Sequence, residues 1–319
     1  MTTLTMRPYA GEADLQPICD LLNHCDAVDR LDDSYAVEDL RLEFDDPRLD
    51  PARDLRLWEG AGGQLVGFGQ TWVPQDASTG DGFLYWRLHP GARGDGIEGE
   101  LIAWGGQRIR EATRGRGLDA RLISSAREHD AYSRGVLTQH GMAPIRYFYK
   151  MSRPLGEPIE DTPLPEGFTL RHVASDADIA AWVDAYNLSF IDHWNHHPRT
   201  VESHRHWLRH PSYQPERDLI AVAPDGTVAA ICFCNIDPEE NARNGSNAGS
   251  VHILGTRRGY RKIGLGRAIL LSGLRRLRDD GVDTARLNVD AENPTGALRL
   301  YESVGFSVTY MSIAYAQDL

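Results

Sequence analysis

The chain repeats one sequence pattern after about half its length, and no other feature limits its possible folds as strongly. Residues 4–15 return in recognisable form at residues 168–179, an offset of 164 positions in a chain of 319 residues. Identical residue types recur at that offset, as at Thr5 and Thr169, Arg7 and Arg171, Asp14 and Asp178, and Asn23 and Asn187. A repeat of this length, in a chain long enough for two domains, predicts two copies of one domain.

A proline-rich stretch separates the two copies. Residues 152–167 contain Pro154, Pro158, Pro163 and Pro165 and few apolar side chains, which is typical of a linker. The sequence therefore predicts a first domain at residues 1–152, a linker at residues 153–165 and a second domain at residues 166–319.

Strand and helix patterns alternate within each copy. Residues 55–58 and 65–72 flank a glycine-rich turn, and residues 218–223 and 227–235 flank a second turn, so each copy should contain a β-hairpin. In the second copy, apolar residues recur at helical spacing after Gly264 and stop at Gly281. The predicted class is α+β, with a mixed central sheet flanked by helices in each domain.

A glycine-rich turn in the second copy has the features of an anion site. Residues 258–268, here called the cradle, follow the apolar strand run 251–254 and open an amphipathic helix. Gly264 and Gly266 let the backbone approach a ligand, and the free amides and dipole of a helix N-terminus favour phosphate. Neither a G-x-G-x-x-G motif nor a P-loop lysine is present, which disfavours both common nucleotide motifs. Four basic residues add positive charge: Arg258, Arg261, Lys262 and Arg267.

Two signatures together resemble the GNAT family of N-acetyltransferases. Residues 261–266 match its pyrophosphate-loop pattern, Arg/Gln-x-x-Gly-x-Gly/Ala, and residues 293–306 match Asn-x-x-x-Ala-x-x-Leu-Tyr-x-x-x-Gly-Phe. The resemblance implies two GNAT domains in tandem, with acetyl-CoA as co-substrate and a primary amine as acceptor. It assigns cofactor binding to eleven residues of the second copy: Leu254, Gly255, Thr256, Arg261, Lys262, Ile263, Gly264, Leu265, Gly266, Arg267 and Asn293.

The same resemblance implies a catalytic role for Tyr301. A phenol with a pKa of about 10 can donate a proton to a leaving thiolate whose thiol has a pKa of about 8.5. A structural alternative makes Tyr301 a core aromatic residue and Asn293 a helix cap. The spacing that both residues share with the cradle favours the functional interpretation.

Three residues are candidates for the remaining catalytic roles. Related tandem members of the family carry a glutamate as the base on the strand before the cradle, where this chain has Ser250. Period-two alternation should place residues 250, 252 and 254 on one strand face, so that Ser250 lies on the same side as His252. His252 and Asp290 are therefore the candidate bases, with Ser250 as a further candidate catalytic residue.

The first copy departs from these signatures at three positions. Glu98 stands where the second copy has Gly266, and a negative charge there would repel a pyrophosphate. His129 and Leu137 stand in place of Asn293 and Tyr301. We expect the first domain to be a degenerate, catalytically silent copy and the second domain to carry the activity.

The charge balance of the chain disfavours several classes of partner. Its 46 acidic and 34 basic residues give a net charge of -12, so no chain-wide positive field attracts nucleic acid or anionic membrane. No apolar run is long enough to span a bilayer and no secretory signal is evident, so we expect a cytoplasmic protein, as a monomer or homodimer. The spacing of the cysteines fits no zinc or redox motif, and they should be packed thiols: Cys19, Cys25, Cys232 and Cys234.

Six histidines lie between residues 193 and 210, in a connection that borders the acceptor pocket in this fold. No cysteine or carboxylate pattern completes a metal site around them, so no metal is expected. A polar pocket wall and a solvated helix face are the two other interpretations.

The leading functional hypothesis is acetyl-CoA-dependent acetylation of the primary amine of a small molecule. Acetylation of a protein or peptide amine is an alternative, and it predicts turnover of peptides but not of small amines. A second alternative is a CoA-binding module that has lost catalysis, because Ser250 replaces the glutamate; it predicts binding without turnover.

Overall fold

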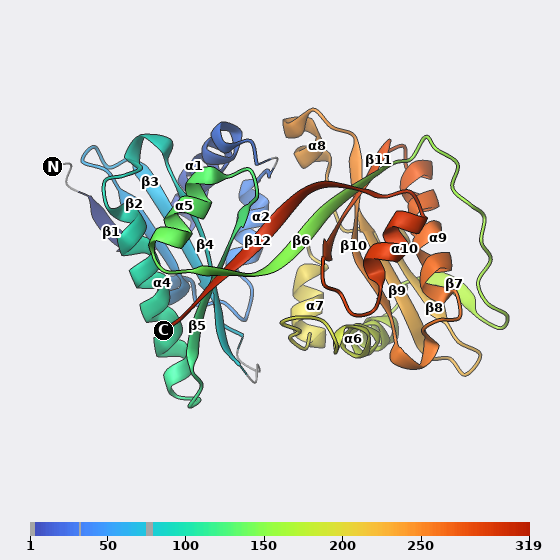
Figure 1. The fold of residues 1–319 in the computed structure, drawn as a ribbon. Helices are drawn as coiled ribbons and strands as arrows, with labels where there is room; N and C mark the ends of the chain where they lie inside the picture. Colours follow the sequence, from blue (N-terminus) through green and yellow to red (C-terminus); the bar gives the residue numbers. More distant parts are fainter. Residues whose placement is uncertain (1–3, 32, 75–78) are drawn as a thin grey trace. The chain divides into compact units, whose positions relative to one another are not determined.

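The computed structural model describes residues 4–31, 33–74 and 79–319. They form two compact units, the first made of the chain up to Tyr147 together with residues 312–319, and the second made of residues 148–311 (Figure 1). In each unit helices flank a mixed sheet, which confirms the predicted α+β class.

The first unit orders its sheet as β1-β2-β3-β4-β5-β12, and of these pairs β4 and β5 are parallel. Helices α1 and α2 pack with Phe68 on one face, whereas Trp104 of α4 lies against Gly69 on the other face. Its elements are β1 (Thr5–Pro8), η1 (Glu12–Asp14), α1 (Leu15–Asp29), α2 (Val37–Phe44), α3 (Pro51–Asp54), β2 (Leu55–Glu59), β3 (Leu65–Trp72), β4 (Gly80–Leu88), η2 (Pro90–Ala92), α4 (Ile97–Arg114), β5 (Ala120–Arg127), α5 (Ala131–Gln139) and the start of β6 (Ala143–Pro154).

The second unit orders its sheet as β6-β11-β10-β9-β8-β7, and of these pairs β10 and β11 are parallel. Its elements are β7 (Thr169–His172), α6 (Asp176–Phe190), α7 (Val201–Trp207), η3 (Pro215–Arg217), β8 (Asp218–Val222), β9 (Val228–Asn235), α8 (Pro238–Asn244), β10 (Ala248–Thr256), η4 (Arg258–Tyr260), α9 (Leu265–Asp279), β11 (Thr284–Asp290), α10 (Ala297–Ser303) and the start of β12 (Ser307–Asp318).

The repeated arginine and aspartate near the start of each copy form the same tether. In the first unit Asp14 accepts hydrogen bonds from the guanidinium of Arg7 at 2.7 Å and from the amide of Ala10 at 2.7 Å. In the second unit Asp178 accepts from Arg171 and from the amide of Ala174. These identities in the repeat therefore fix the first strand to the first long helix.

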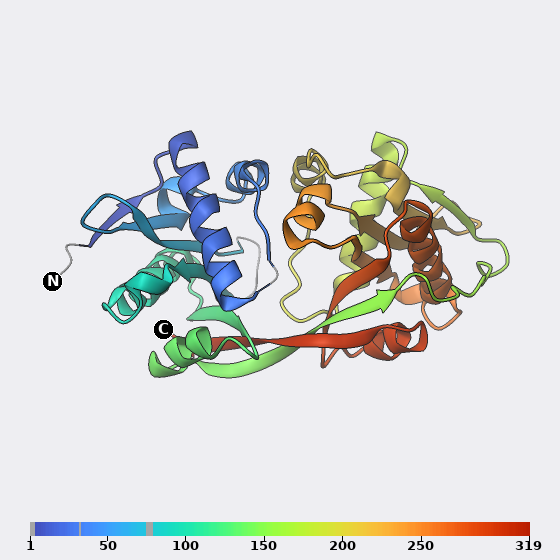
Figure 2. The same cartoon turned by 90° about the horizontal axis from the view of Figure 1, so that it is seen from above.

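Strands β6 and β12 each pass from one unit into the other (Figure 2). Residues 148–154 of β6, which end the first copy, pair with β11 of the second unit. Residues 312–318 of β12, which end the second copy, pair with β5 of the first unit. The last strand of each copy completes the sheet that the other copy begins. The compact units therefore differ at these two segments from the domain boundaries expected from the repeat.

Strands β10 and β11 separate partway along their length. They pair in parallel at residues 248–250 and 284–286, and the pairing does not continue beyond Ser250 and Arg286. On its other edge β10 stays paired with β9, but the register shifts between Val251 and Ile253, so that His252 is the extra residue of a β-bulge. Bulges re-aim side chains and are frequent next to active sites.

The bulge corrects one prediction about the face of β10. His252 contacts Trp207 and Phe233 on the side covered by α6 and α7. Gly249 and Leu254 instead face the core of α9, since a Cβ at Gly249 would meet Leu277 and Leu254 packs against that core. Ser250 alternates with Gly249 and so lies on the same face as His252, as predicted. Leu254 lies on the opposite face, because the bulge adds one residue between Ser250 and Leu254.

Candidate active site

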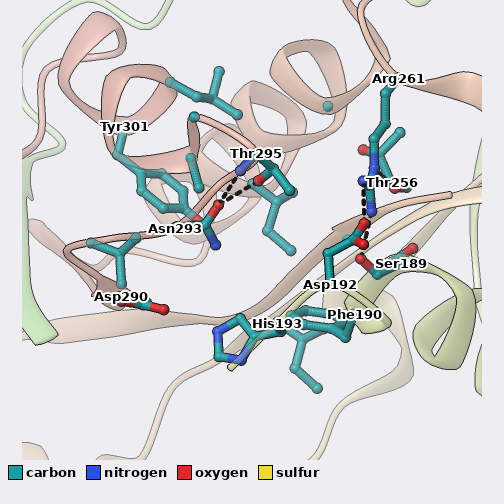
Figure 3. Close-up of a pocket in the computed structure, with 18 of the residues that line it drawn as sticks. Ser189, Phe190, Asp192, His193, Thr256, Arg261, Asp290, Asn293, Thr295 and Tyr301 are labelled. Atoms are coloured by element: carbon teal, nitrogen blue, oxygen red, sulfur yellow. Dashed lines mark hydrogen bonds and ion pairs between the residues drawn. The ribbon is translucent and has the colours of Figure 1, made fainter. Parts of the chain in front are cut away.

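A cleft of about 730 Å³ opens in the second unit where β10 and β11 part. Its walls are residues 251–256 of β10, 288–290 of β11, the cradle, residues 293–301 around the start of α10, and the end of α6 (Figure 3). Nine of the eleven predicted cofactor residues line it: Leu254, Gly255, Thr256, Arg261, Lys262, Gly264, Gly266, Arg267 and Asn293. The other two do not, because Ile263 is exposed and Leu265 is buried in the core under α9.

The backbone of the cradle leaves the amides at the start of α9 available to a ligand. Gly264 is the N-cap residue, with a φ of 86°, and no side chain caps the helix there. The first bond within the helix runs from the amide of Ala268 to the carbonyl of Gly264, so the amides of residues 265–267 have no partner inside the helix. This arrangement fits a phosphate group.

Lys262 holds a backbone conformation that few non-glycine residues adopt. Its φ is 66°, in the left-handed region, which costs a side-chain-bearing residue about 1 kcal/mol or more. The first copy has Gly94 at the equivalent position, with a φ of 85°. The second copy therefore keeps a cation at a strained position on the wall of the cleft, where it can face an anion.

Tyr301 lies on α10, nearly buried, and lines the cleft opposite His193 (Figure 3). Burial raises the pKa of its phenol well above the ordinary value, and the nearby Cys232 thiol adds to the shift. The phenol therefore stays protonated at neutral pH and can act as a proton donor. Its ring also packs against Phe306 with a centroid separation of 6.0 Å, so Tyr301 is part of the core as well.

Asn293 caps a turn and not the helix. Its side-chain oxygen accepts hydrogen bonds from the amide of Thr295 at 2.8 Å and from the Thr295 hydroxyl at 2.5 Å. Helix α10 begins only at Ala297, after Gly296 as its N-cap, so Pro294 lies before the first turn. The Asn293 amide nitrogen is directed toward the centre of the cleft (Figure 3).

The three candidates for the remaining catalytic roles differ in their access to the cleft. His252 lines it and is exposed, with its ring stacked on Trp207 at a centroid separation of 5.4 Å. Desolvation by the surrounding protein and, to a lesser degree, the positive charge of Arg199 lower the pKa of His252. The imidazole is therefore neutral at pH 7. Asp290 also lines the cleft but is buried and accepts a hydrogen bond from the amide of Glu292 at 3.0 Å. Ser250 is not among the lining residues.

The end of α6 supplies a wall that the sequence motifs did not identify. Ser189, Phe190, Asp192 and His193 line the cleft (Figure 3). The helix approaches β10 closely, because a Cβ at Gly255 would lie 2.9 Å from the Cβ of Ser189. The only sequence signal for this wall was the run of six histidines at residues 193–210. Of the four lining residues, that run includes His193 alone.

The other histidines of that stretch vary in their surroundings. His204 is fully buried, with its ring stacked on Trp182 at a centroid separation of 4.1 Å. Burial, and then Arg199, lower the pKa of His204 to about 3. His204 is therefore a core residue and not part of a polar pocket wall.

The equivalent turn in the first unit is filled by its own side chain. The Glu98 carboxylate accepts hydrogen bonds from the amide of Gly94 at 2.7 Å and from the Tyr132 hydroxyl at 2.9 Å. Hydrogen bonds from backbone amides and from Tyr132 lower the pKa of Glu98 despite its burial. A carboxylate thus sits where the second unit offers open amides.

Most of the chain is similar in sequence to known acetyltransferases. The pattern of the acetyltransferase (GNAT) family matches residues 179–306. A mycothiol acetyltransferase of Thermobispora bispora is 32% identical over 268 residues, covering 83% of each chain. A mycothiol acetyltransferase of Thermomonospora curvata is 31% identical, over 75% of this chain and 80% of the relative.

Solved structures show the same tandem fold. A GCN5-related N-acetyltransferase from Sphaerobacter thermophilus superposes with a TM-score of 0.75 at 24% identity, over 99% of this chain and 95% of that one. A tandem GNAT protein from the clavulanic acid biosynthesis pathway gives a TM-score of 0.72 at 16% identity, over 99% and 98% of the two chains.

The chain therefore belongs to the GNAT family of acetyltransferases and is an N-acetyltransferase with acetyl-CoA as its co-substrate. Within the family it is a tandem GNAT protein that resembles the mycothiol acetyltransferases in its layout. Among the described residues, no helix is both long and apolar enough to cross a membrane.

Proposed function

We propose that the cleft of the second unit transfers the acetyl group of acetyl-CoA to the primary amine of a small molecule. One observation carries this proposal: the open amides of the cradle, the protonated Tyr301 and the neutral His252 all line one cleft. The relatives named mycothiol acetyltransferases support a small-molecule acceptor, and they make a mycothiol-type amine the first acceptor to test.

The cradle would hold the pyrophosphate of acetyl-CoA through the amides at the start of α9, with Lys262 as a cation beside it. The edge of β10 beyond Ser250 has no partner on β11. Its unpaired backbone groups need hydrogen-bond partners, and the amides of the pantetheine arm can supply them. This edge leads from the cradle toward His252.

The reaction itself needs a neutral amine and a protonated leaving thiol. The amine nitrogen attacks the thioester carbonyl carbon, and the resulting intermediate collapses into an amide and a thiolate. Tyr301 donates its phenolic proton to that thiolate and recovers a proton from solvent afterwards. Burial keeps Tyr301 protonated at neutral pH, so the phenol is available as a donor when the thiolate forms.

His252 is the residue that we propose as the base. It is exposed to the cleft, and its lowered pKa leaves it unprotonated and able to accept the proton of the attacking amine. Its stack on Trp207 holds the ring in one orientation. Asp290 is less suitable, because it is buried and already accepts a backbone hydrogen bond.

The first unit would not take part in the chemistry. The Glu98 carboxylate already accepts hydrogen bonds from backbone amides of the equivalent turn, those of Gly94, Gly96 and Glu98 itself. Leu137 has no proton to donate in place of Tyr301. We therefore assign catalysis to the second unit alone.

Acetyl-CoA turnover by the full chain tests the proposal, with a mycothiol-type amine, glucosamine and a lysine-containing peptide as acceptors. We expect turnover of a small amine and none of the peptide. His252→Ala should lower kcat and leave the affinity for coenzyme A unchanged, whereas His172→Ala, on an exposed strand position, should change neither. Turnover of the peptide alone, or tight binding of coenzyme A without turnover of any amine, would contradict it.

A further inference from the structure

Arg261 belongs to the pyrophosphate-loop signature, yet its guanidinium bonds to protein groups in this chain. Its Nε donates to the carbonyl of Thr256 at 2.9 Å, and its Nη2 donates to the carbonyl of Ser189 at 2.8 Å. Its Nη1 donates to the carboxylate of Asp192 at 3.0 Å. One side chain thus connects the end of β10, the last turn of α6 and the segment after α6.

Asp192 connects this segment to the cradle a second time. Its carboxylate also pairs with Arg258, the first residue of η4. The hydrogen bonds from Arg258 and Arg261 lower the pKa of Asp192 to about 2, so the carboxylate is charged at any physiological pH. Figure 3 shows Asp192 directed toward Arg261 across the cleft wall.

The elements joined in this way have different tasks in the cleft. The cradle would face the phosphate end of the cofactor, as proposed above, whereas Phe190 and His193, on either side of Asp192 in the sequence, face Asn293 and Asp290 across the cleft (Figure 3). The carbonyl of Ser189 lies in the last turn of α6, where a cation is also favoured by the helix dipole.

We propose that Asp192 and Arg261 form a positioning pair that fixes the end of α6 to the cradle, so that coenzyme A bound at the cradle also orders Phe190 and His193. The proposal rests on the cofactor site assigned above and adds two roles to it. Arg261 holds the loop in shape and leaves the pyrophosphate to the backbone amides and Lys262. Asp192 acts through Arg261 and Arg258 and touches no substrate.

The competing role for Arg261 is direct binding of phosphate. In that case Asp192 would compete with the cofactor for the guanidinium, and removing the carboxylate would strengthen binding of coenzyme A. The two roles therefore predict opposite signs for the same substitution. In a positioning pair, Asp192→Ala and Arg261→Gln both loosen the loop and both weaken binding.

Calorimetric titration of the full chain with coenzyme A alone distinguishes these roles. We expect Asp192→Ala to weaken binding about threefold, because it removes a partly exposed ion pair. Arg261→Gln should weaken binding about tenfold, because it also removes hydrogen bonds to two backbone carbonyls. The double variant should lose less affinity than the product of the two single losses, because the two substitutions remove one shared ion pair. Asp184→Ala is the matched control, since it removes a carboxylate of α6 that pairs with Arg257, at 2.9 Å, just before the cradle.

Hydrogen exchange provides the readout that a purely structural role would not change. In the unmodified chain, coenzyme A should slow exchange in residues 261–268 and also in residues 190–193. In Asp192→Ala the protection should remain in the cradle and be lost from residues 190–193. Tighter binding by Asp192→Ala, additive effects of the two substitutions, or equal protection of residues 190–193 in both proteins would overturn the proposal. Turnover failing on every amine would refute the proposed acceptor chemistry while leaving this result intact.

Discussion

Replacing Gly266 by glutamate should close the cofactor site, and the first unit shows how. At the equivalent position Glu98 turns its carboxylate onto the amide of Gly94 at 2.7 Å. Gly266 lies within α9 and has no positive φ, so Gly266→Glu is compatible with the backbone. The introduced carboxylate would accept hydrogen bonds from backbone amides of the cradle and would place a negative charge where we assign the pyrophosphate.

The size of the effect follows from the charges. Two unit charges about 4 Å apart repel by about 4 kcal/mol at an effective dielectric constant of about 20. Because the cleft is open to solvent, the loss of binding free energy should be smaller, roughly 3 kcal/mol. At about 1.4 kcal/mol for each factor of ten, the affinity for coenzyme A should fall about 100-fold.

Calorimetry with coenzyme A and with pantetheine measures this effect and separates it from a change in shape. Gly266→Ala is the matched control, because it adds a Cβ 3.0 Å from the Thr256 hydroxyl but no charge; it should weaken coenzyme A binding only slightly. Pantetheine, which lacks the pyrophosphate, should bind the glutamate variant as it binds the parent chain. Equal affinities of Gly266→Glu and Gly266→Ala for coenzyme A would refute the assignment of the cradle.

Four further outcomes can be measured. Tyr301→Phe keeps the contact with Phe306 and removes the donor, so kcat should fall about 100-fold in the acetyl-CoA turnover assay while calorimetry shows unchanged coenzyme A binding; an unchanged kcat would mean that another donor serves the thiolate. Adding Glu98→Gly to Tyr301→Phe should restore no turnover, because Leu137 has no proton to donate; recovery would show a second competent site. Lys262→Gly should stabilise the fold by about 1 kcal/mol in urea unfolding, since it relieves the left-handed strain, and should weaken coenzyme A binding; changes of the same sign in both measurements would contradict this. His204 has a pKa lowered to about 3 in the folded chain, so the unfolded chain takes up the proton first and stability falls as the pH drops from about 6.5 toward 3, by about 2 kcal/mol at pH 5. Unfolding of His204→Phe at pH 7.5 and pH 5 should lack that part of the loss, and an equal loss in both proteins would exclude His204 as its source.

Much of the site could be predicted because its signals are local in the sequence. The cradle and the helix after it depend on glycines and apolar spacing within about 20 residues, and Asn293 and Tyr301 belong to one short motif. The fold class likewise follows from elements that each copy contains in the same order.

The parts that the sequence did not reveal depend on contacts between distant residues. Asp192 reaches Arg261 across 69 positions, and nothing in the residues around Asp192 marks it as a partner of the cradle. The bulge at His252 arises from the pairing of β10 with β9, so strict alternation along β10 misplaced Leu254. The sequence also does not show which strand pairs with the last strand of each copy. Alternation of apolar and polar residues identifies a strand but not the sheet that it joins.

The crossing of β6 and β12 determines how the chain can be divided. A break in residues 156–167, which contain no helix or strand, would leave two polypeptides that each carry a strand of the other's sheet. The N-terminal piece would expose the edge of β5, and the C-terminal piece the edge of β11. Open edges of this kind invite pairing with other chains. Neither copy of the repeat is therefore a free-standing module, and a gene encoding one copy alone would specify an incomplete sheet.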